Sequence, residues 1–248
     1  MNTLPDRIAA GWADAVSWLA EVTPQGRRAA RGPAGAVITR TPVTSLNAAY
    51  DMSREPDLAA LDEMAAVVAR YEVPWSIIVR GEAADAVAGL AARHGLTARS
   101  PMPVMACAAT DAVLDGASDP AIRVAGADQS HLYTRVLNAG FGADFGGLMQ
   151  GGVLEAPGFT GYLAYRRGRA VGTGLGVLSG ETAGVFNIGV LPAERGRGLG
   201  RALAARTLAD GFAAGATTAY LHPSHDGWAL YESMGFRVVD TWAAFAGE

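Results

Sequence analysis

The sequence predicts an α/β fold in which helices pack on a mixed β-sheet, an α+β arrangement. The chain has 248 residues, half of them apolar, which is enough for one large domain or two small ones. Short apolar runs typical of buried strands alternate with segments whose apolar residues recur at helical spacing. The order helix, strand, helix, strand occurs in both halves of the chain, which favours this class of fold.

The first half supplies one set of these elements. From Glu55 to Tyr71, apolar residues at helical spacing predict an amphipathic helix. Residues 74–79 then predict a buried strand, residues 90–96 the end of a second helix, and residues 104–108 a second strand. Upstream of these elements, the arginines within residues 27–31 are expected in a solvated loop.

A polar stretch punctuated by glycine and proline, residues 110–120, separates the two sets of elements. Domain boundaries fall in such segments. We therefore expect an N-terminal domain at residues 1–115 and a C-terminal domain at residues 119–248.

The second half opens with a short strand at residues 122–125 and a helix at residues 129–137. A glycine-rich segment, residues 139–147, follows the helix and is expected to be flexible. Its aromatic side chains, Phe141 and Phe145, either close over a substrate or make small contacts with the core.

The remaining elements follow from the same patterns. Strands are expected at residues 159–165, 171–178, 185–191, 217–221 and 238–245, and a helix at residues 199–214.

The turn before that helix has the composition of an anion site. Three alternate glycines within residues 196–200 remove side chains that would keep a phosphate from the backbone, and the next residues begin a helix with free N–H groups. Arginines at 195, 197 and 201 add positive charge. The spacing fits neither the G-x-G-x-x-G/A dinucleotide motif nor the P-loop. A glycine-rich connection with solvated arginines is the alternative interpretation.

The two halves also share a repeated segment. Residues 90–96 align with residues 230–236 at an offset of 230 − 90 = 140. The first half has Ala91 where the second has Tyr231, and residues 52–57 replace the glycine-arginine turn. If the halves are related, the first lacks both the anion site and the tyrosine.

Two motifs in register resemble the GNAT family of N-acetyltransferases. R-x-x-G-x-G at residues 195–200 is similar to the acyl-CoA pyrophosphate loop of that family, and L-Y-E-x-x-G-F at residues 230–236 to its closing signature, with Ser224 seven residues before the tyrosine. The resemblance covers residues 121 to 246. It implies a GNAT fold, here as two GNAT-like halves in tandem, of which the N-terminal one is degenerate and the C-terminal one catalytic.

The resemblance also implies roles for individual residues. Acetyl-CoA would pair its pantetheine with the main chain of Ile188 and Val190, and the Ile188 N–H would stabilise the oxyanion as an amine attacks. Tyr231 would then protonate the CoA thiolate, although a tyrosine at this position can also be a packing residue. The implied cofactor-binding residues are Ile188, Gly189, Val190, Arg195, Gly196, Arg197, Gly198, Leu199, Gly200, Arg201 and Ser224.

The general base is not assigned by the motifs. Some relatives have a glutamate where this chain has Gly184. His222 follows the strand at residues 217–221 and has a side chain suited to proton transfer near neutral pH, but it can equally cap that strand. The expected substrate-binding residues are Phe141, Phe145 and Asn187.

The sequence thus predicts an acyl-CoA-dependent N-acyltransferase that transfers acetyl from acetyl-CoA to a primary amine of a small molecule by direct attack in a ternary complex. A non-catalytic acyl-CoA-binding sensor or scaffold protein is the alternative. The acceptor amine, the length of the acyl group and the oligomeric state stay open.

Composition excludes several other classes. The net charge of −4 and the lack of a basic stripe argue against nucleic acid as a partner. No apolar run approaches the ~20 residues that span a bilayer. The lone Cys107 provides neither a disulfide nor a thiolate cluster for zinc, so no metal is expected. Without a visible secretory signal, we expect a cytoplasmic protein.

Overall fold

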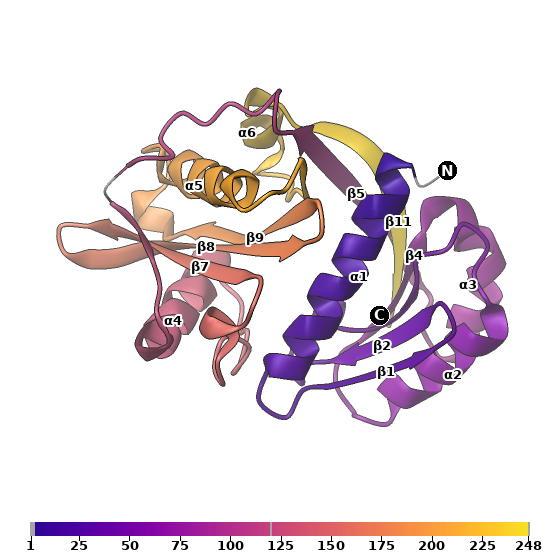
Figure 1. Cartoon of the computed structure of the whole chain (residues 1–248). Helices are drawn as coiled ribbons and strands as arrows, with labels where there is room; N and C mark the ends of the chain where they lie inside the picture. Colours follow the sequence, from indigo (N-terminus) through magenta and orange to yellow (C-terminus); the bar gives the residue numbers. More distant parts are fainter. Residues whose placement is uncertain (1–2, 120, 248) are drawn as a thin grey trace. The chain divides into compact units, whose positions relative to one another are not determined.

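A computed structural model describes residues 3–119 and 121–247 of the chain. These residues form two compact units. Unit 1 contains the chain up to Val104 together with the segment from Val238 onward, and unit 2 contains Met105–Arg237. Each unit contains both strands and helices (Figure 1).

Unit 1 has a mixed sheet. Its elements are α1 (Leu4–Val22), β1 (Arg27–Arg31), β2 (Ala34–Ile38), η1 (Thr44–Leu46), β3 (Asn47–Asp51), α2 (Leu58–Ala69), β4 (Ser76–Arg80), η2 (Gly81–Ala83), α3 (Ala84–Arg93), the first part of β5 (Ala98–Ala108) and β11 (Arg237–Ala246). The strand order is β1-β2-β3-β4-β11, with the first part of β5 beside β11. Strands β3 and β4 are parallel. Antiparallel pairing joins β1 to β2, β2 to β3 and β4 to β11.

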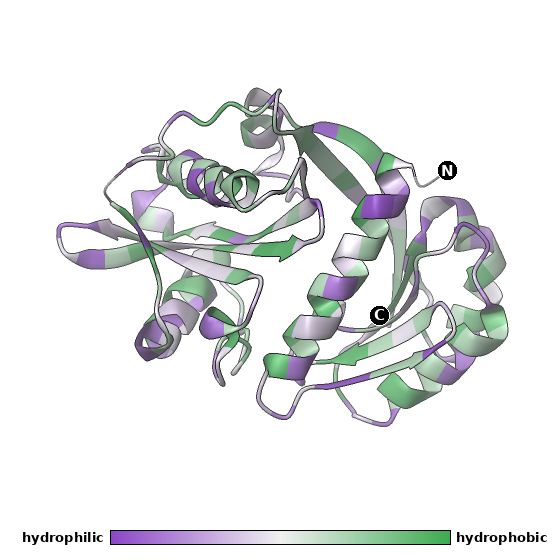
Figure 2. Ribbon diagram, viewed as in Figure 1, coloured by the Kyte–Doolittle hydropathy of each residue, from purple (hydrophilic) through white to green (hydrophobic). Residues whose placement is uncertain are grey.

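Helix α1 covers one face of this sheet, and α2 and α3 cover the other (Figure 1). Thr3 begins α1 by forming a capping box with Asp6. The Trp12 ring packs edge-on against both Tyr50 and Trp242, with ring centroids 5.4 and 5.2 Å away. Apolar and polar residues alternate along α1 (Figure 2), as expected for a helix that buries one face.

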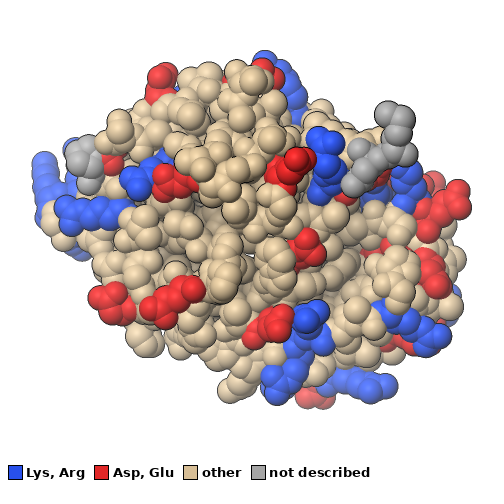
Figure 3. All heavy atoms as spheres, viewed as in Figure 1, with Lys and Arg blue, Asp and Glu red and all other residues tan. Residues whose placement is uncertain are grey.

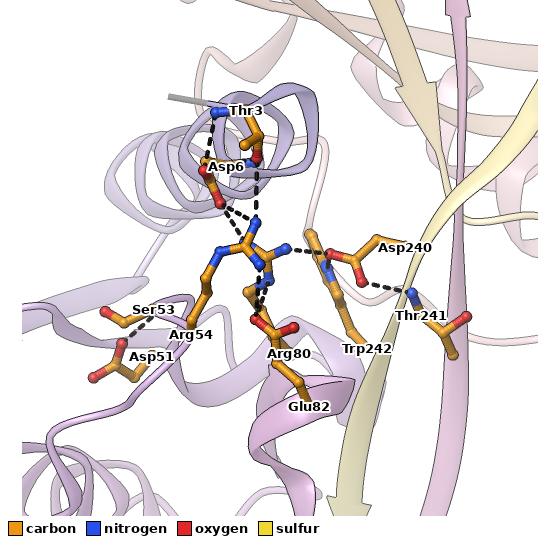
Figure 4. A network of polar contacts seen from close by, with 10 residues as sticks. All are labelled: Thr3, Asp6, Asp51, Ser53, Arg54, Arg80, Glu82, Asp240, Thr241 and Trp242. Atoms are coloured by element: carbon orange, nitrogen blue, oxygen red, sulfur yellow. Dashed lines mark hydrogen bonds and ion pairs between the residues drawn. The ribbon is translucent and has the colours of Figure 1, made fainter. Parts of the chain in front are cut away.

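A network of charged side chains ties α1, β4 and β11 together within unit 1 (Figure 4). The Arg80 side chain is 4% exposed and pairs with Asp6 at 2.7 Å and with Asp240 at 3.0 Å. Hydrogen bonds from Thr3, together with the Arg80 guanidinium, hold the pKa of Asp6 well below its usual range. Because Asp240 belongs to β11, this network anchors the last strand of the chain in the first unit.

Unit 2 begins with an additional strand, β6, and then repeats the order of helices and strands of unit 1. Its elements are β6 (Ile122–Val124), η3 (Ala127–Gln129), α4 (Ser130–Phe141), η4 (Val153–Glu155), β7 (Phe159–Arg166), β8 (Arg169–Ser179), β9 (Thr182–Val190), η5 (Pro192–Glu194), α5 (Leu199–Ala213), β10 (Thr218–Leu221) and α6 (Trp228–Ser233). The strand order is β10-β9-β8-β7-β6, and β10 pairs on its other side with Met105–Ala108 at the end of β5. Helices α5 and α6 pack on one face, and α4 lies on the other (Figure 1).

The last strand of each half therefore belongs partly or largely to the other unit. Strand β5, which ends the first half of the chain, contributes Met105–Ala108 to unit 2, and β11, which follows α6, pairs with β4 in unit 1. The chain passes between units inside β5 and not in the polar stretch 110–120, because the pairing of β5 with β10 holds the end of that strand in unit 2. The division into domains at residues 1–115 and 119–248 stays a prediction.

The expected fold class is confirmed, since both units have a mixed sheet covered by helices. One local expectation was wrong. Residues Arg27–Arg31 form the edge strand β1, because they pair with all five residues of β2. The arginine side chains are still exposed, as an edge strand that keeps charge toward solvent requires. The sequence patterns also gave no signal for α1.

Candidate functional site

Two parallel strands of unit 2 separate after a short paired stretch. Strand β9 pairs with β10 only from Thr182 to Gly184, yet it continues to Val190. From Val185 onward, the edge of β9 on this side has no partner strand in the described residues. Unpaired main-chain groups at such an edge are available to a ligand.

The same strand contains a β-bulge on its other side. One residue of β8, Gly174, lies opposite two residues of β9, Asn187 and Ile188. Asn187 has φ +53°, a left-handed conformation that is uncommon for a residue with a side chain. A bulge changes the direction of the groups of its own residues, here Ile188 and its amide.

The glycine-arginine turn leads into helix α5 with its amides free. Gly196 and Gly198 have φ +72° and +80°, which explains the need for glycine at both positions. None of the six N–H groups from Gly196 to Arg201 donates a hydrogen bond to a described residue, and the first N–H that does is that of Ala202. A row of free amides at the start of a 15-residue helix is suited to bind an anion.

The Arg195 side chain holds two elements of this site together through hydrogen bonds to main-chain carbonyls. Its Nη2 donates to the Gly140 carbonyl at 2.8 Å and its Nε donates to the Val190 carbonyl at 3.2 Å. The guanidinium therefore joins the end of α4 to the end of β9. The backbones are close here, since a Cβ on Gly140 would lie 3.4 Å from the Val190 nitrogen.

The other two arginines of the turn differ in placement. Arg201 lines the cavity described below and bonds to the Ser233 hydroxyl. Arg197 pairs with Glu194 at 3.7 Å and is not among the described residues that line this cavity. Of the two, only Arg201 lines the cavity.

These elements enclose a cavity of about 660 Å³. It is lined by Gly140, Phe141, Ile188, Gly189, Val190, Glu194, Arg195, Gly196, Gly198, Leu199, Gly200, Arg201, Ser224, Asp226, Gly227, Leu230 and Tyr231. Ten of the eleven cofactor-binding residues expected from the sequence therefore lie on one cavity, and Arg197 is the exception.

Tyr231 lies on helix α6 at the wall of this cavity. The residue is 8% exposed, and burial raises the pKa of its phenol to about 12. Its hydroxyl makes no hydrogen bond to any described residue. The ring packs against Phe236 and against Gly227, where a Cβ would lie 3.0 Å from it. A protonated phenol without a protein acceptor can donate to a ligand in the cavity.

His222 and Ser224 follow β10, and only one of them reaches the cavity. Ser224 lines it, and the Oγ of Ser224 accepts the Gly227 N–H at 3.1 Å. His222 is not among the lining residues of the described chain. Its expected part in proton transfer is therefore without support from this geometry.

The expected substrate-binding residues are likewise divided. Phe141 lines the cavity and packs on Gly189, where a Cβ would lie 2.7 Å from the ring. Phe145 contacts the Phe141 ring edge-on at 5.5 Å but is itself buried outside the lining. Asn187 is the bulge residue, and its Nδ2 lies 3.8 Å from the Met149 sulfur.

Sequence reasoning missed five of the lining residues: Gly140, Glu194, Asp226, Gly227 and Leu230. For one of them a signal existed. Gly227 precedes Tyr231 by four residues, so one helical turn brings it onto the same face as the tyrosine. Gly140 could not be found, because its place depends on how α4 packs on β9.

The separated strands, the bulge and the free amides at the start of α5 lie in a part of unit 2 that matches a known protein family. Residues 131–236 match the model of the acetyltransferase (GNAT) family, and this part of the chain is a GNAT acetyltransferase domain. No curated protein sequence matches the chain at a significant level.

Solved structures are similar over the whole chain. A GCN5-related N-acetyltransferase from Kribbella flavida is 21% identical with a TM-score of 0.72, and the match covers 100% of this chain and 96% of that one. A putative GNAT acetyltransferase from Novosphingobium aromaticivorans is 18% identical with a TM-score of 0.60, covering 94% and 96%. A GCN5-related N-acetyltransferase from Sphaerobacter thermophilus is 16% identical with a TM-score of 0.58, covering 87% and 76%. At these identities the comparison establishes the GNAT fold.

Metal-binding clusters and membrane-spanning helices are not found among the described residues. Residues 3–119 and 121–247 contain no group of three or more His, Cys, Asp or Glu side chains placed to hold a metal ion. No helix in this part of the chain is long and apolar enough to cross a membrane. On the face drawn in Figure 3, basic and acidic residues are interspersed.

Proposed function

We propose that the chain transfers acetyl from acetyl-CoA to a primary amine of a small molecule, by direct attack in a ternary complex. The observation that carries this proposal is the single cavity on which free amides, an unpaired strand edge and the Tyr231 phenol meet. A metal has no part in the proposed reaction.

The amides of residues 196–201 are proposed to bind the pyrophosphate of the cofactor. Gly200 supports this assignment, because a Cβ there would meet Leu230 and Val190 only at ordinary contact distances of 3.8 and 4.0 Å. Packing within the protein therefore does not require glycine at this position. The close approach of a ligand does.

The reaction would begin with attack of the amine nitrogen on the thioester carbonyl carbon. The Ile188 N–H would stabilise the oxyanion that forms, a contribution of about 3 kcal/mol for one donor. Collapse of the intermediate breaks the carbon–sulfur bond, and Tyr231 gives its proton to the departing thiolate. Because position 184 is a glycine and His222 does not line the cavity, we assign the proton lost by the amine to water.

The first half of the chain is proposed to be a degenerate GNAT-like scaffold that binds no cofactor. Its β3 pairs with β4 as far as Asp51, the last residue of β3, so these strands do not separate as β9 and β10 do. The N–H groups at the start of α2 are bonded to the Asp57 carboxylate. We therefore expect one acetyl-CoA per chain.

An amine-library screen that follows thiol release from acetyl-CoA tests the proposal. The chain has no lysine, so thiol release cannot come from acetylation of its own lysine side chains. We expect amine-dependent release, with one acetyl-CoA bound per chain by calorimetry. Binding without release for any amine would favour the alternative, an acyl-CoA sensor, and two cofactors per chain would contradict the scaffold role.

A further inference from the structure

Two buried hydroxyl groups meet the bulge of β9 from within unit 2. The Tyr133 hydroxyl, carried by α4, donates to the Gly174 carbonyl at 2.8 Å. The Thr173 hydroxyl, on β8, donates to the Asn187 carbonyl at 2.8 Å. Gly174 and Asn187 are residues of the bulge itself, where the regular pairing of β8 with β9 is interrupted.

Both donors are completely enclosed. Tyr133 and Thr173 are 0% exposed, so their hydroxyls have no access to water and must bond within the protein. Burial raises the pKa of the Tyr133 phenol, which favours the protonated form that donates this hydrogen bond.

The bulge holds Asn187 in a left-handed conformation, with φ +53°. Asparagine adopts this conformation more readily than most other residues with a side chain, but it still needs surroundings that select it from the other allowed conformations. The Asn187 side chain lies 3.8 Å from the Met149 sulfur, a weak acceptor, and also interacts with the Tyr133 hydroxyl. The Thr173 hydroxyl in addition holds the Asn187 carbonyl at 2.8 Å.

The next residue along β9 is Ile188, which lines the cavity. We propose that Tyr133 and Thr173 are positioning residues: by fixing the Gly174 and Asn187 carbonyls, they set the direction of the Ile188 N–H at the thioester carbonyl. This inference rests on the proposed function. An oxyanion donor acts only within a few tenths of an ångström of the right place, so a loosened bulge would lower the rate of the chemical step and leave cofactor binding intact.

Three substitutions and a matched control test the proposal. Tyr133→Phe and Thr173→Val each remove one hydroxyl and keep the shape, and Thr173→Ser restores the donor. The control is Tyr162→Phe, which removes another buried hydroxyl of the same sheet, bonded to Asp210 at 2.9 Å and outside the cavity lining. Like the test variants, this control loses the hydrogen bond of a tyrosine or threonine hydroxyl, but its partner, Asp210, is not a residue of the bulge.

We expect Tyr133→Phe and Thr173→Val to lower kcat 10- to 100-fold, with the acetyl-CoA Kd changed less than 3-fold. Thr173→Ser should recover most of the rate, and Tyr162→Phe should keep it. If kcat in both test variants stays within 3-fold of the control, or falls only together with cofactor affinity, the positioning role is wrong.

A second readout does not depend on turnover. Amide hydrogen exchange of the peptide that covers residues 186–189 should be at least 5-fold faster in Tyr133→Phe and Thr173→Val than in Tyr162→Phe. If the natural chain shows no turnover with any amine, the proposed function fails, and this exchange still decides the role of the two hydroxyls. Equal exchange rates in the three variants would overturn it.

Discussion

Asp57 begins helix α2 as Gly198 begins helix α5. The Asp57 carboxylate accepts hydrogen bonds from the N–H groups of Ala59 and Ala60 at 3.0 Å each. These two N–H groups at the start of α2 are therefore not available to a ligand. Gly198 has no side chain, and the amides after it are free. Two helices at the same place in the repeated order of elements thus differ in whether an external anion can reach them.

This difference predicts the effect of a carboxylate at the start of α5. Gly198→Asp should weaken acetyl-CoA binding by about 10²-fold or more, because the new side chain competes for the amides and repels the pyrophosphate. Calorimetry with the folded variant measures the effect. Gly168→Asp is the control, since Gly168 has a similar φ of +76° against +80° but lies in a hairpin turn outside the cavity lining. An unchanged affinity of Gly198→Asp for acetyl-CoA would contradict the assignment of an anion site to this turn.

A second prediction concerns the proton donor. Tyr231→Phe should lower kcat about 10²- to 10⁴-fold and leave the acetyl-CoA Kd nearly unchanged, since the phenol is needed only when the thiolate leaves. Steady-state rates and calorimetry separate the two quantities, with Tyr162→Phe again as the control for a lost buried hydroxyl. Loss of binding at an unchanged kcat would make Tyr231 a packing residue.

The buried phenol also predicts how stability changes with pH. Folding raises the pKa of Tyr231 from 10.0 to about 12, so the folded state prefers the neutral phenol. Its contribution is complete below pH 10 and is lost as pH rises from 10 to 12, by about 1.4 kcal/mol per pH unit. In urea unfolding at pH 9, 10 and 11, Tyr231→Phe should therefore lose free energy of unfolding less steeply than the natural chain. Parallel pH profiles would show that the phenol is not desolvated.

The pairing of β5 with β10 and of β11 with β4 predicts that the C-terminal half of the chain does not fold properly by itself. A fragment of residues 119–248 lacks Met105–Ala108, the partner of β10, and carries β11 without β4. Both changes expose strand edges, and we expect this fragment to be insoluble or poorly folded.

The matched fragment is Met105–Arg237, which keeps the partner of β10 and omits β11. It should give a larger soluble fraction on expression and size-exclusion chromatography, and it should bind acetyl-CoA. A soluble, fully active fragment of residues 119–248 would contradict the importance of these strand pairings.

The sequence alone determined the parts of this protein that are local in the chain. The turn at residues 195–201 and the helix that carries Tyr231 could be predicted because their glycines, charges and apolar spacing act within a few residues of one another. The repeat at an offset of 140 (230 − 90) also predicted the order of elements, which recurs in the two units.

Only the tertiary structure decided which strands pair and where the side chains of the site point. No local pattern indicates that β11 joins β4 or that β5 ends beside β10, because strand pairing is fixed by contacts between residues far apart in sequence. The same reason applies to Arg195, whose charge suggested a ligand contact. Its bonds to the Gly140 and Val190 carbonyls arise only when α4 packs on β9, and hydrogen bonds between distant segments leave no periodic signal in the sequence.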